Sequence, residues 1–262
     1  MEQESFQPDF AVLESVFVRR RNCLLLRGNF TPVYTDYYLH LMQHGLRNEP
    51  EIDLDLKKTL ALFTLHMATR PWAEYHAWTL NLCTPFQANL FVCGSSLTES
   101  VVGRSFTEDI RVPEENMLYA QTIRDGSQPQ TSVIVLHGAT PEEWVENYYR
   151  QSEQRPGRCF DLGGDRFALL SAQPGADRDW LLEADAALVA GIEEREETRL
   201  LETRRFRFHC GCTVGKILPA LKAMKADLAD ILSEEGRVDV ACPRCAAVYQ
   251  VTADMLAQPD AP

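Results

Sequence analysis

Two closely spaced cysteine pairs constrain this chain more than any other feature of its sequence. The segments FHCGC and ACPRC carry four of the eight cysteines, and 29 residues separate the second pair from the first. Four thiolates can surround Zn²⁺ tetrahedrally at about 2.3 Å, and the intervening chain is long enough to fold back and join the pairs. The sequence therefore predicts a zinc site formed by Cys210, Cys212, Cys242 and Cys245.

Turn-forming residues inside the two pairs support this prediction. Gly211 has no Cβ, so it allows a tight turn between Cys210 and Cys212. Pro243 fixes its own φ and favours a turn of the zinc-knuckle kind within CPRC. His209 is a fifth possible ligand, but four sulfurs already close a structural site, so we expect it to be a neighbour.

The main rival interpretation takes CPRC as a thioredoxin-like redox centre. That chemistry needs a βαβ context with the first cysteine at a helix N-terminus. Here CPRC lies between two strand-like segments, RVDVACP and AAVYQVT, and has a second cysteine pair in the same region. The pattern favours zinc over a redox catalyst.

The other candidate ligands and nucleophiles give weaker signals. His40 and His44 are four residues apart on a predicted helix and could share a metal, but Leu41 stands where an HExxH motif has glutamate, so packing is the better interpretation. No nucleophile elbow, Gly-rich phosphate loop or triad is evident, so no enzyme activity is expected. The remaining cysteines are expected to be small buried side chains: Cys23, Cys83, Cys93 and Cys159.

Composition and charge narrow the functional classes. The 262 residues carry a net charge of −12, a field that repels phosphate backbones and disfavours nucleic acid as a partner. No apolar run approaches the ~20 residues needed to cross a bilayer, so no membrane role is expected. The acidic, polar start MEQESFQPDF does not resemble a secretory signal. We therefore expect a cytoplasmic protein, in which structural disulfides are rare.

Hydrophobic patterning predicts an α+β fold in three parts. Residues 1–175 alternate strand-like runs with helical ones, and the sequence Thr140-Pro141-Glu142-Glu143 is typical of a helix start. Residues 176–205 are expected to form a charged helical linker, and residues 206–262 the zinc domain, with an amphipathic helix at 216–232. The run Arg19–Arg21 is interpreted as a solvated strand end next to a turn at Gly28-Asn29.

The linker permits two interpretations. IEEREETRLLETRR (192–205) is crowded with charge and has few apolar anchors, so it is expected to be a marginal helix held by weak i,i+4 pairs. It is either a solvated connector or a segment poised to melt. The sequence alone favours the connector.

The chain resembles the heat shock protein 33 family of redox-regulated holdase chaperones. The residues that carry the resemblance are FHCGC, the following helix and strand, CPRC with AVYQV after it, and two upstream segments, YYRQSEQRP and LLSAQPGAD. They cover about the last 115 residues, whereas the N-terminal half lacks an alignable family motif. The resemblance implies a core α+β domain, a helical linker and a C-terminal zinc domain.

The resemblance also implies a mechanism. The reduced protein would hold one Zn²⁺ through Cys210, Cys212, Cys242 and Cys245, and oxidation would produce the disulfides Cys210–Cys212 and Cys242–Cys245. The linker and zinc domain would then loosen, and unfolded client proteins would bind without ATP. The resemblance also implies a homodimer on activation. Two alternatives stay open: a constitutive protein-binding module with a structural zinc, and a thiol–disulfide oxidoreductase.

Overall fold

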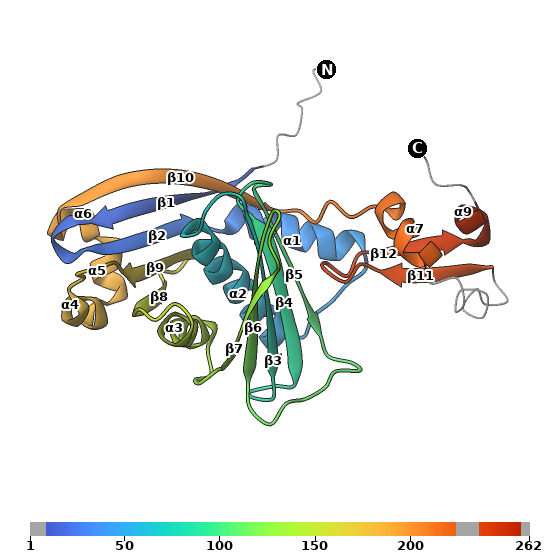
Figure 1. Cartoon of the computed structure of the whole chain (residues 1–262), viewed down its shortest axis with the longest axis horizontal. Helices are drawn as coiled ribbons and strands as arrows, with labels where there is room; N and C mark the ends of the chain where they lie inside the picture. The colour runs from blue at the N-terminus through green and yellow to red at the C-terminus, as the bar shows by residue number, and fades with distance from the viewer. Residues whose placement is uncertain (1–8, 224–235, 258–262) are drawn as a thin grey trace, which may run out of the picture.

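A twisted ten-stranded sheet forms the body of the protein, and a small two-stranded sheet lies at one end (Figure 1). The structure is a computed structural model that describes residues 9–223 and 236–257. The strand order of the large sheet is β7-β6-β3-β4-β5-β10-β1-β2-β9-β8, and the small sheet pairs β11 with β12. The mixed architecture confirms the predicted α+β class.

The bounds of the elements are as follows. The strands are β1 (Ala11–Val18), β2 (Cys23–Asn29), β3 (Glu74–Leu82), β4 (Ala88–Ser95), β5 (Ser100–Phe106), β6 (Met117–Arg124), β7 (Gln130–Val135), β8 (Gly157–Asp161), β9 (Arg166–Ala172), β10 (Thr198–Phe208), β11 (Arg237–Ala241) and β12 (Val248–Thr252). The helices are α1 (Thr31–Gln43), α2 (Pro50–Ala68), α3 (Pro141–Gln151), α4 (Arg178–Glu183), α5 (Ala186–Ala190), α6 (Ile192–Arg195), α7 (Val214–Ala223) and α9 (Ala253–Ala257).

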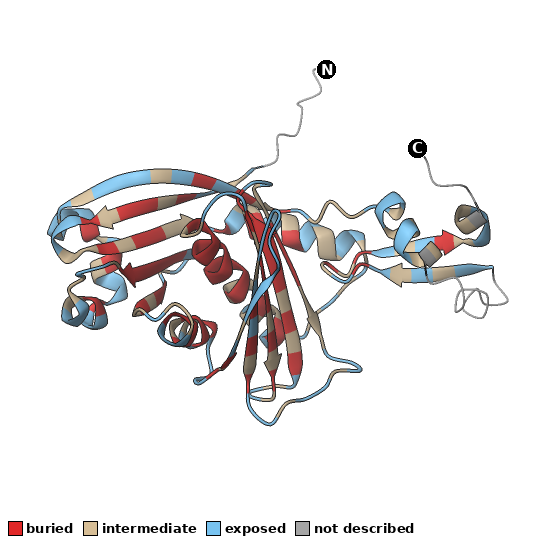
Figure 2. Ribbon diagram, in the orientation of Figure 1, coloured by how far each residue is buried: buried red, intermediate tan, exposed pale blue. Residues whose placement is uncertain are grey.

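The large sheet consists of two antiparallel halves that meet at β5 and β10. Their pairing is parallel and joins only Arg207 to Ser100 and Phe208 to Val101. Helix α2 lies in the angle between the halves and contacts strands of both (Figure 1). Its last turns are buried on every side, as the red ribbon in Figure 2 shows. Burial on that scale makes α2 the centre of the hydrophobic core.

Helix α3 begins where the sequence predicts. The Thr140 side chain accepts a hydrogen bond from the Glu143 backbone N–H, and the Glu143 carboxylate accepts one from the Thr140 backbone N–H, at 3.3 and 3.1 Å. Pro141 occupies the first turn. The arrangement is a capping box, which satisfies donors that the helix itself leaves open.

The charged segment 192–205 differs from its prediction. Only Ile192–Arg195 is helical; from Thr198 onward the chain is strand β10, paired along β1 in the middle of the large sheet. Arg204 is buried there, donates to Ser96 and to the Arg70 carbonyl, and lies over the Trp72 ring. A charged segment that was expected to be a solvated helix is therefore mostly a paired strand with one buried arginine. Long-range strand pairing overrides its local helix propensity.

The turn between the first two strands also differs from its prediction. Arg19–Arg21 forms a 3-10 turn between β1 and β2, so the turn is not at Gly28-Asn29. Arg21 binds Asp177 at 2.7 Å and Glu196 at 3.0 Å, and Arg19 binds Glu197 at 2.9 Å. The run thus lies at the solvated end of β1, as expected, and its ion pairs join that end to the acidic residues around α4 to α6.

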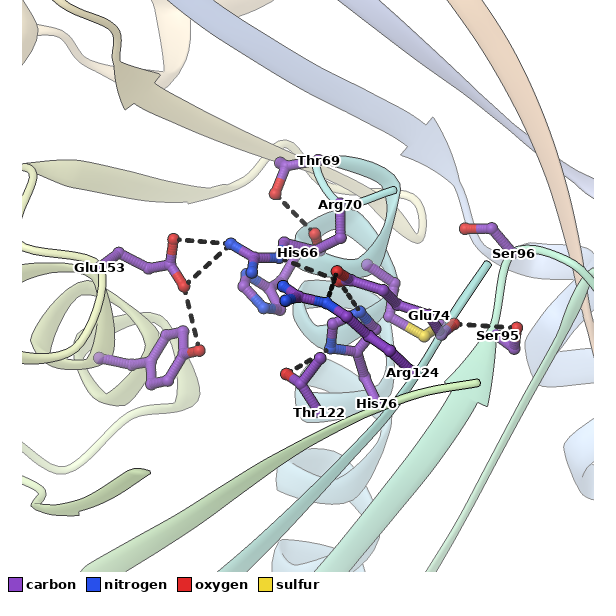
Figure 3. A network of polar contacts seen from close by, with 12 residues as sticks. His66, Thr69, Arg70, Glu74, His76, Ser95, Ser96, Thr122, Arg124 and Glu153 are labelled. Atoms are coloured by element: carbon purple, nitrogen blue, oxygen red, sulfur yellow. Dashed lines mark hydrogen bonds and ion pairs between the residues drawn. The ribbon is translucent and has the colours of Figure 1, made fainter. Parts of the chain in front are cut away.

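A buried polar network fastens the end of α2 to β3, β6 and α3 (Figure 3). Glu74 accepts from Arg124 at 2.6 Å and lies 3.1 Å from the His76 ring nitrogen. Burial lowers the pKa of His76 to about 4 and that of the neighbouring His66 well below its usual value. Both rings are therefore neutral at pH 7, which suits their apolar surroundings.

Three strands of the large sheet were not expected from the sequence: β10, described above, and also β6 and β8. The sequences of β6 and β8 are MLYAQTIR and GRCFD. Their neighbours β3 and β9 supply the pairing.

Within the described ranges, no helix is long and apolar enough to cross a membrane.

Candidate metal centre

Four cysteine sulfurs gather where the chain leaves the large sheet. Strand β10 ends at Phe208, and Cys210 follows two residues later, while Cys242 directly follows β11. The sulfurs of Cys210, Cys212, Cys242 and Cys245 all lie within 4.8 Å of one another. The structure thus brings together all four cysteines that the spacing singles out.

The sulfur arrangement fits a tetrahedral ion. Cys210 Sγ lies 3.8 Å from Cys242 Sγ, and Cys212 Sγ lies 3.5 Å from Cys245 Sγ. Four sulfurs at about 2.3 Å from one tetrahedral centre are about 3.8 Å apart. The four thiols can therefore hold one metal ion without rearrangement, and soft sulfur donors suit Zn²⁺ among others.

Backbone geometry at each pair accounts for this convergence. Gly211 has φ +62°, in the left-handed region that glycine enters without strain. In the second pair, the Cys242 carbonyl accepts from the Ala246 N–H at 2.9 Å, and the Cys242 N–H donates to the Ala247 carbonyl at 2.8 Å. These bonds close a knuckle over CPRC and aim both sulfurs at one point.

The thiols are not electrostatically equivalent. Hydrogen bonds from Cys245, and to a smaller extent from Cys212, lower the pKa of the Cys210 thiol to about 5. The partner, Cys245, has its pKa raised by the same hydrogen bond and by burial. Cys210 therefore carries negative charge most readily in the absence of an ion, and thiolate is the form that binds metals and reacts with oxidants.

The knuckle is fastened to the core by two core side chains. His40 Nε2, on α1, donates to the Cys245 carbonyl at 2.8 Å. Arg104 Nη1, on β5, donates to the Cys242 carbonyl at 3.0 Å. Each bond joins a backbone atom of a clustered cysteine to the large sheet or its helix, so the position of the cluster and that of the core are coupled.

Aromatic contacts complete this junction. The Phe208 ring packs against Tyr37 and His40, with centroids 5.3 and 5.4 Å apart. Tyr249, on β12, donates its hydroxyl to the Cys212 carbonyl at 3.0 Å and lies 3.1 Å from the Cys212 sulfur. We call the described residues 209–223 and 236–257 the cysteine module.

The other candidates take the places that the sequence favoured. His44 stacks near His40 and Tyr249, and His209 is not among the described groups that can hold a metal. Cys23, Cys93 and Cys159 are buried, and Cys83 is half-buried. Sequence reasoning missed the roles of Arg104, which lies in no motif, and of Tyr249, which lies in AVYQV but was given no contact with the cysteines; only the fold brings both to the cluster.

Comparisons with known proteins agree with this geometry. The family model described as Hsp33 protein matches residues 168–252. A 33 kDa chaperonin of Methylobacillus flagellatus is 28% identical over 152 residues, which is 48% of this chain and 51% of that protein. A 33 kDa chaperonin of Nostoc punctiforme is 40% identical over 173 residues, or 53% of this chain and 58% of that protein.

A solved structure extends the likeness of fold to the whole chain. The 33 kDa chaperonin (heat shock protein 33 homolog) of Thermotoga maritima superposes with a TM-score of 0.69, at 16% sequence identity, and covers 94% of this chain and 96% of that one. The curated relatives, by contrast, are matched over about half of their length. The family model and the relatives thus show that this chain is similar to the heat shock protein 33 family, as the sequence indicated, and the solved structure shows the same fold.

Proposed function

We propose that this protein is a redox-regulated, ATP-independent chaperone that holds unfolded proteins after its cysteine cluster is oxidised. The observation that carries the proposal is the cluster itself: four sulfurs within 4.8 Å of one another, on a module attached to the core through the cysteine backbone. The printed names of the relatives, 33 kDa chaperonin, point to the same class of activity. We propose the cytoplasm as its compartment.

In the reduced state, Cys210, Cys212, Cys242 and Cys245 are the proposed ligands of one Zn²⁺. The ion would supply a tetrahedral cross-link that holds the two pairs together and contributes on the order of 10 kcal/mol to folding of the module. The chain's own residues do the rest: Gly211 and the CPRC knuckle set the sulfur positions, and Tyr249 covers the Cys212 edge of the cluster.

Oxidation is proposed to begin at a thiolate. A peroxide oxidises one cysteine sulfur to a sulfenate and is itself reduced to water or an alcohol. The adjacent thiol of the same pair then attacks the sulfenate, and a disulfide forms with loss of water. The proposed products are Cys210–Cys212 and Cys242–Cys245, and sulfurs in disulfides no longer act as thiolate ligands.

Loss of the cluster has a defined structural consequence. Because His40 and Arg104 hold the carbonyls of Cys245 and Cys242, a module that no longer fixes those residues also loses its attachment to the core. The face of α1 and β5 beneath it would be uncovered, and apolar surface from the module and the core would be available to unfolded clients. A homodimer of the activated form belongs to the same proposal.

The position of β10 limits how far this loosening extends. Residues 198–208 are a strand between β5 and β1, and melting them would separate the halves of the large sheet. We therefore place the response in the cysteine module and its junction with the core, and keep the charged residues 198–205 in the sheet.

The proposal is tested by oxidising the purified, reduced protein with peroxide or hypochlorite. Zinc release, free thiols and suppression of citrate synthase aggregation are measured on the same samples. We expect one zinc per chain before oxidation, loss of four thiols and of the metal after it, and anti-aggregation activity that reduction with zinc reverses. Metal that stays bound, or that leaves with no gain of activity, contradicts the proposal.

A second candidate is a constitutive binding module with a structural zinc. The hydrogen-bonded attachment of the knuckle to the core favours it, because a rigid junction suits a permanent binding surface. It predicts that oxidation abolishes binding rather than creating it. Cys242 is only 3% exposed, which disfavours the third alternative, an oxidoreductase that uses CPRC.

A further inference from the structure

A cavity lined by arginines lies away from the cysteine module, between α3, β8 and α4. Its volume is about 460 Å³, within the usual range of small-molecule sites. Four guanidinium groups line it, together with one carboxylate, that of Glu146. The four, which define what we call the arginine cavity, are Arg150, Arg155, Arg158 and Arg178. Three of them belong to or flank the QSEQRP segment, which the proposed function leaves unexplained.

Arg158 is held rigidly in the wall of the cavity. Its Nε donates to Glu146 at 3.2 Å, and its Nη1 donates to the Leu182 carbonyl. The same Glu146 oxygen also accepts from the Cys159 backbone N–H at 2.9 Å. The one carboxylate of the cavity is thus occupied in orienting Arg158, whose guanidinium keeps further N–H donors for a ligand.

Arg155 is positioned from the opposite side by the buried network. It lies over the Tyr149 ring at 5.4 Å, and its Nη2 is 3.6 Å from Glu153. Glu153 in turn binds Arg70 and Tyr148, as Figure 3 shows for that carboxylate. The QSEQRP segment therefore presents Arg155 on a support anchored in the core, so little conformational entropy is lost when a ligand binds.

The other two arginines contribute uncompensated charge. Arg178 is exposed and makes no side-chain hydrogen bond or ion pair with the described residues, and Arg150 binds only the neutral Asn147 side chain. Glu146 is committed to Arg158 and Glu153 partly offsets Arg155, so the site keeps a net positive charge on a chain whose net charge is −12. Such a site attracts a compact, multiply charged anion.

We propose that the arginine cavity binds a short phosphate chain. Arginine forks suit phosphate oxygens, and guanidiniums from three separate elements can engage several phosphoryl groups at once. No aromatic residue is among those that line the cavity, so a nucleobase has no ring to stack on there. The ligand is therefore recognised through its phosphates, whether it is an inorganic oligophosphate or the triphosphate of a nucleotide.

Calorimetric titration of the full-length, reduced protein tests this inference. The probes are tripolyphosphate, orthophosphate, ATP and AMP at low ionic strength. We expect tripolyphosphate to bind at least about tenfold more tightly than orthophosphate, and the affinity to fall as salt is added. If ATP binds with the same affinity as tripolyphosphate, the ligand class includes nucleoside triphosphates. If ATP binds as weakly as AMP, the class is restricted to inorganic phosphate chains. If AMP binds with the same affinity as ATP and tripolyphosphate, the inference is overturned.

Single substitutions locate the binding site. Arg178→Gln removes a side chain without partners, so the fold should persist, and we expect about a tenfold loss of tripolyphosphate affinity. Arg158→Gln is expected to lose at least as much, and thermal unfolding reports whether it still folds. The matched control is Arg111→Gln, another exposed arginine, outside the cavity. Any heat from metal chelation by the phosphate probes would be the same in all variants. If Arg178→Gln binds tripolyphosphate with the same affinity as the wild-type protein, the inference is overturned.

Discussion

The core and the cysteine module of this protein are stabilised in opposite ways. Twelve of the 19 residues of α2 are buried between the two halves of the large sheet. In the cysteine module, no residue of 214–222 or of β11 is buried. Four described side chains of the module are buried, and two of these belong to the cysteine cluster. The four are Cys242, Cys245, Ala247 and Val251. The core is held by apolar burial, whereas the module depends on its sulfur cluster.

The difference teaches how a switch can coexist with a stable fold. A segment as small as the module buries too little apolar surface to fold without a cross-link. Its stability can therefore be removed by chemistry at four atoms, while the stability of the core is distributed over many side chains. Three experiments test this difference between the core and the module, from the largest expected effect to the smallest.

The largest effect is expected from Cys242→Ser. The substitution removes one proposed ligand, and on the order of 10 kcal/mol of metal-linked stability would be lost from the module. Hydrogen exchange should show loss of amide protection in β11 and β12 with little change in β1 and β2. The control is Cys83→Ser, a half-buried cysteine of the core. Retained protection in β11 and β12 would mean that the module does not depend on the cluster.

An intermediate effect is expected from acid on the core. The pKa of His66 is well below 6.5 in the folded state because the ring is buried, so below that pH the unfolded chain binds a proton that the folded chain does not. Stability should therefore fall as the pH drops below about 6.5: His66 accounts for a loss of about 2 kcal/mol at pH 5, and His76, whose pKa is about 4, adds a similar loss.

Urea unfolding at pH 7 and pH 5 measures this loss. The variant His66→Phe should show a smaller difference between the two pH values, whereas a variant of the exposed His137, His137→Gln, should match wild-type protein. If His66→Phe keeps the full difference, another buried group controls the acid response. The cysteine module, whose stability we propose to depend on a bound metal, should follow metal binding instead.

The smallest effect is expected at the junction. Arg104→Gln removes the charged donor to the Cys242 carbonyl, and a net contribution of about 1 kcal/mol corresponds to about fivefold faster exchange of the module amides. Metal content should not change, because no ligand is altered. Arg111→Gln is the matched control. No change in exchange would show that the His40 bond and the Phe208 contacts hold the module without Arg104.

The sequence predicted the cluster because its determinants are local. Spacing, Gly211 and the CPRC turn lie within a few residues of the sulfurs, and the capping box of α3 is also encoded by adjacent residues, Thr140 to Glu143. The same holds for the strands with β-branched runs. The ligand roles and the domain boundaries at 175 and 205 stay predictions, and the part of the amphipathic helix at 224–232 lies outside the described residues.

The misplaced elements depend on partners far away in the chain. Residues 198–205 carry helix-forming Glu, Arg and Leu, but β1 offers them a paired strand about 190 residues earlier, and buried Arg204 finds acceptors at Ser96 and Arg70. Arg19–Arg21 lies at a strand end, as its sequence indicated, but its ion pairs with acidic residues between 177 and 197 could not be predicted from the sequence. Local propensity cannot report such pairings, since they form only when the chain is folded.

The central place of β10 has a consequence for synthesis. Strands β1 and β5 flank it, and both leave the ribosome long before residues 198–208 do. The two halves of the sheet can therefore fold separately as they emerge, but they cannot be joined until the last strand between them is made. The cysteine pairs begin two residues after that strand ends. The second pair, Cys242 and Cys245, is made more than 30 residues after the end of β10, so the core of each new chain can close before its cysteine cluster is complete.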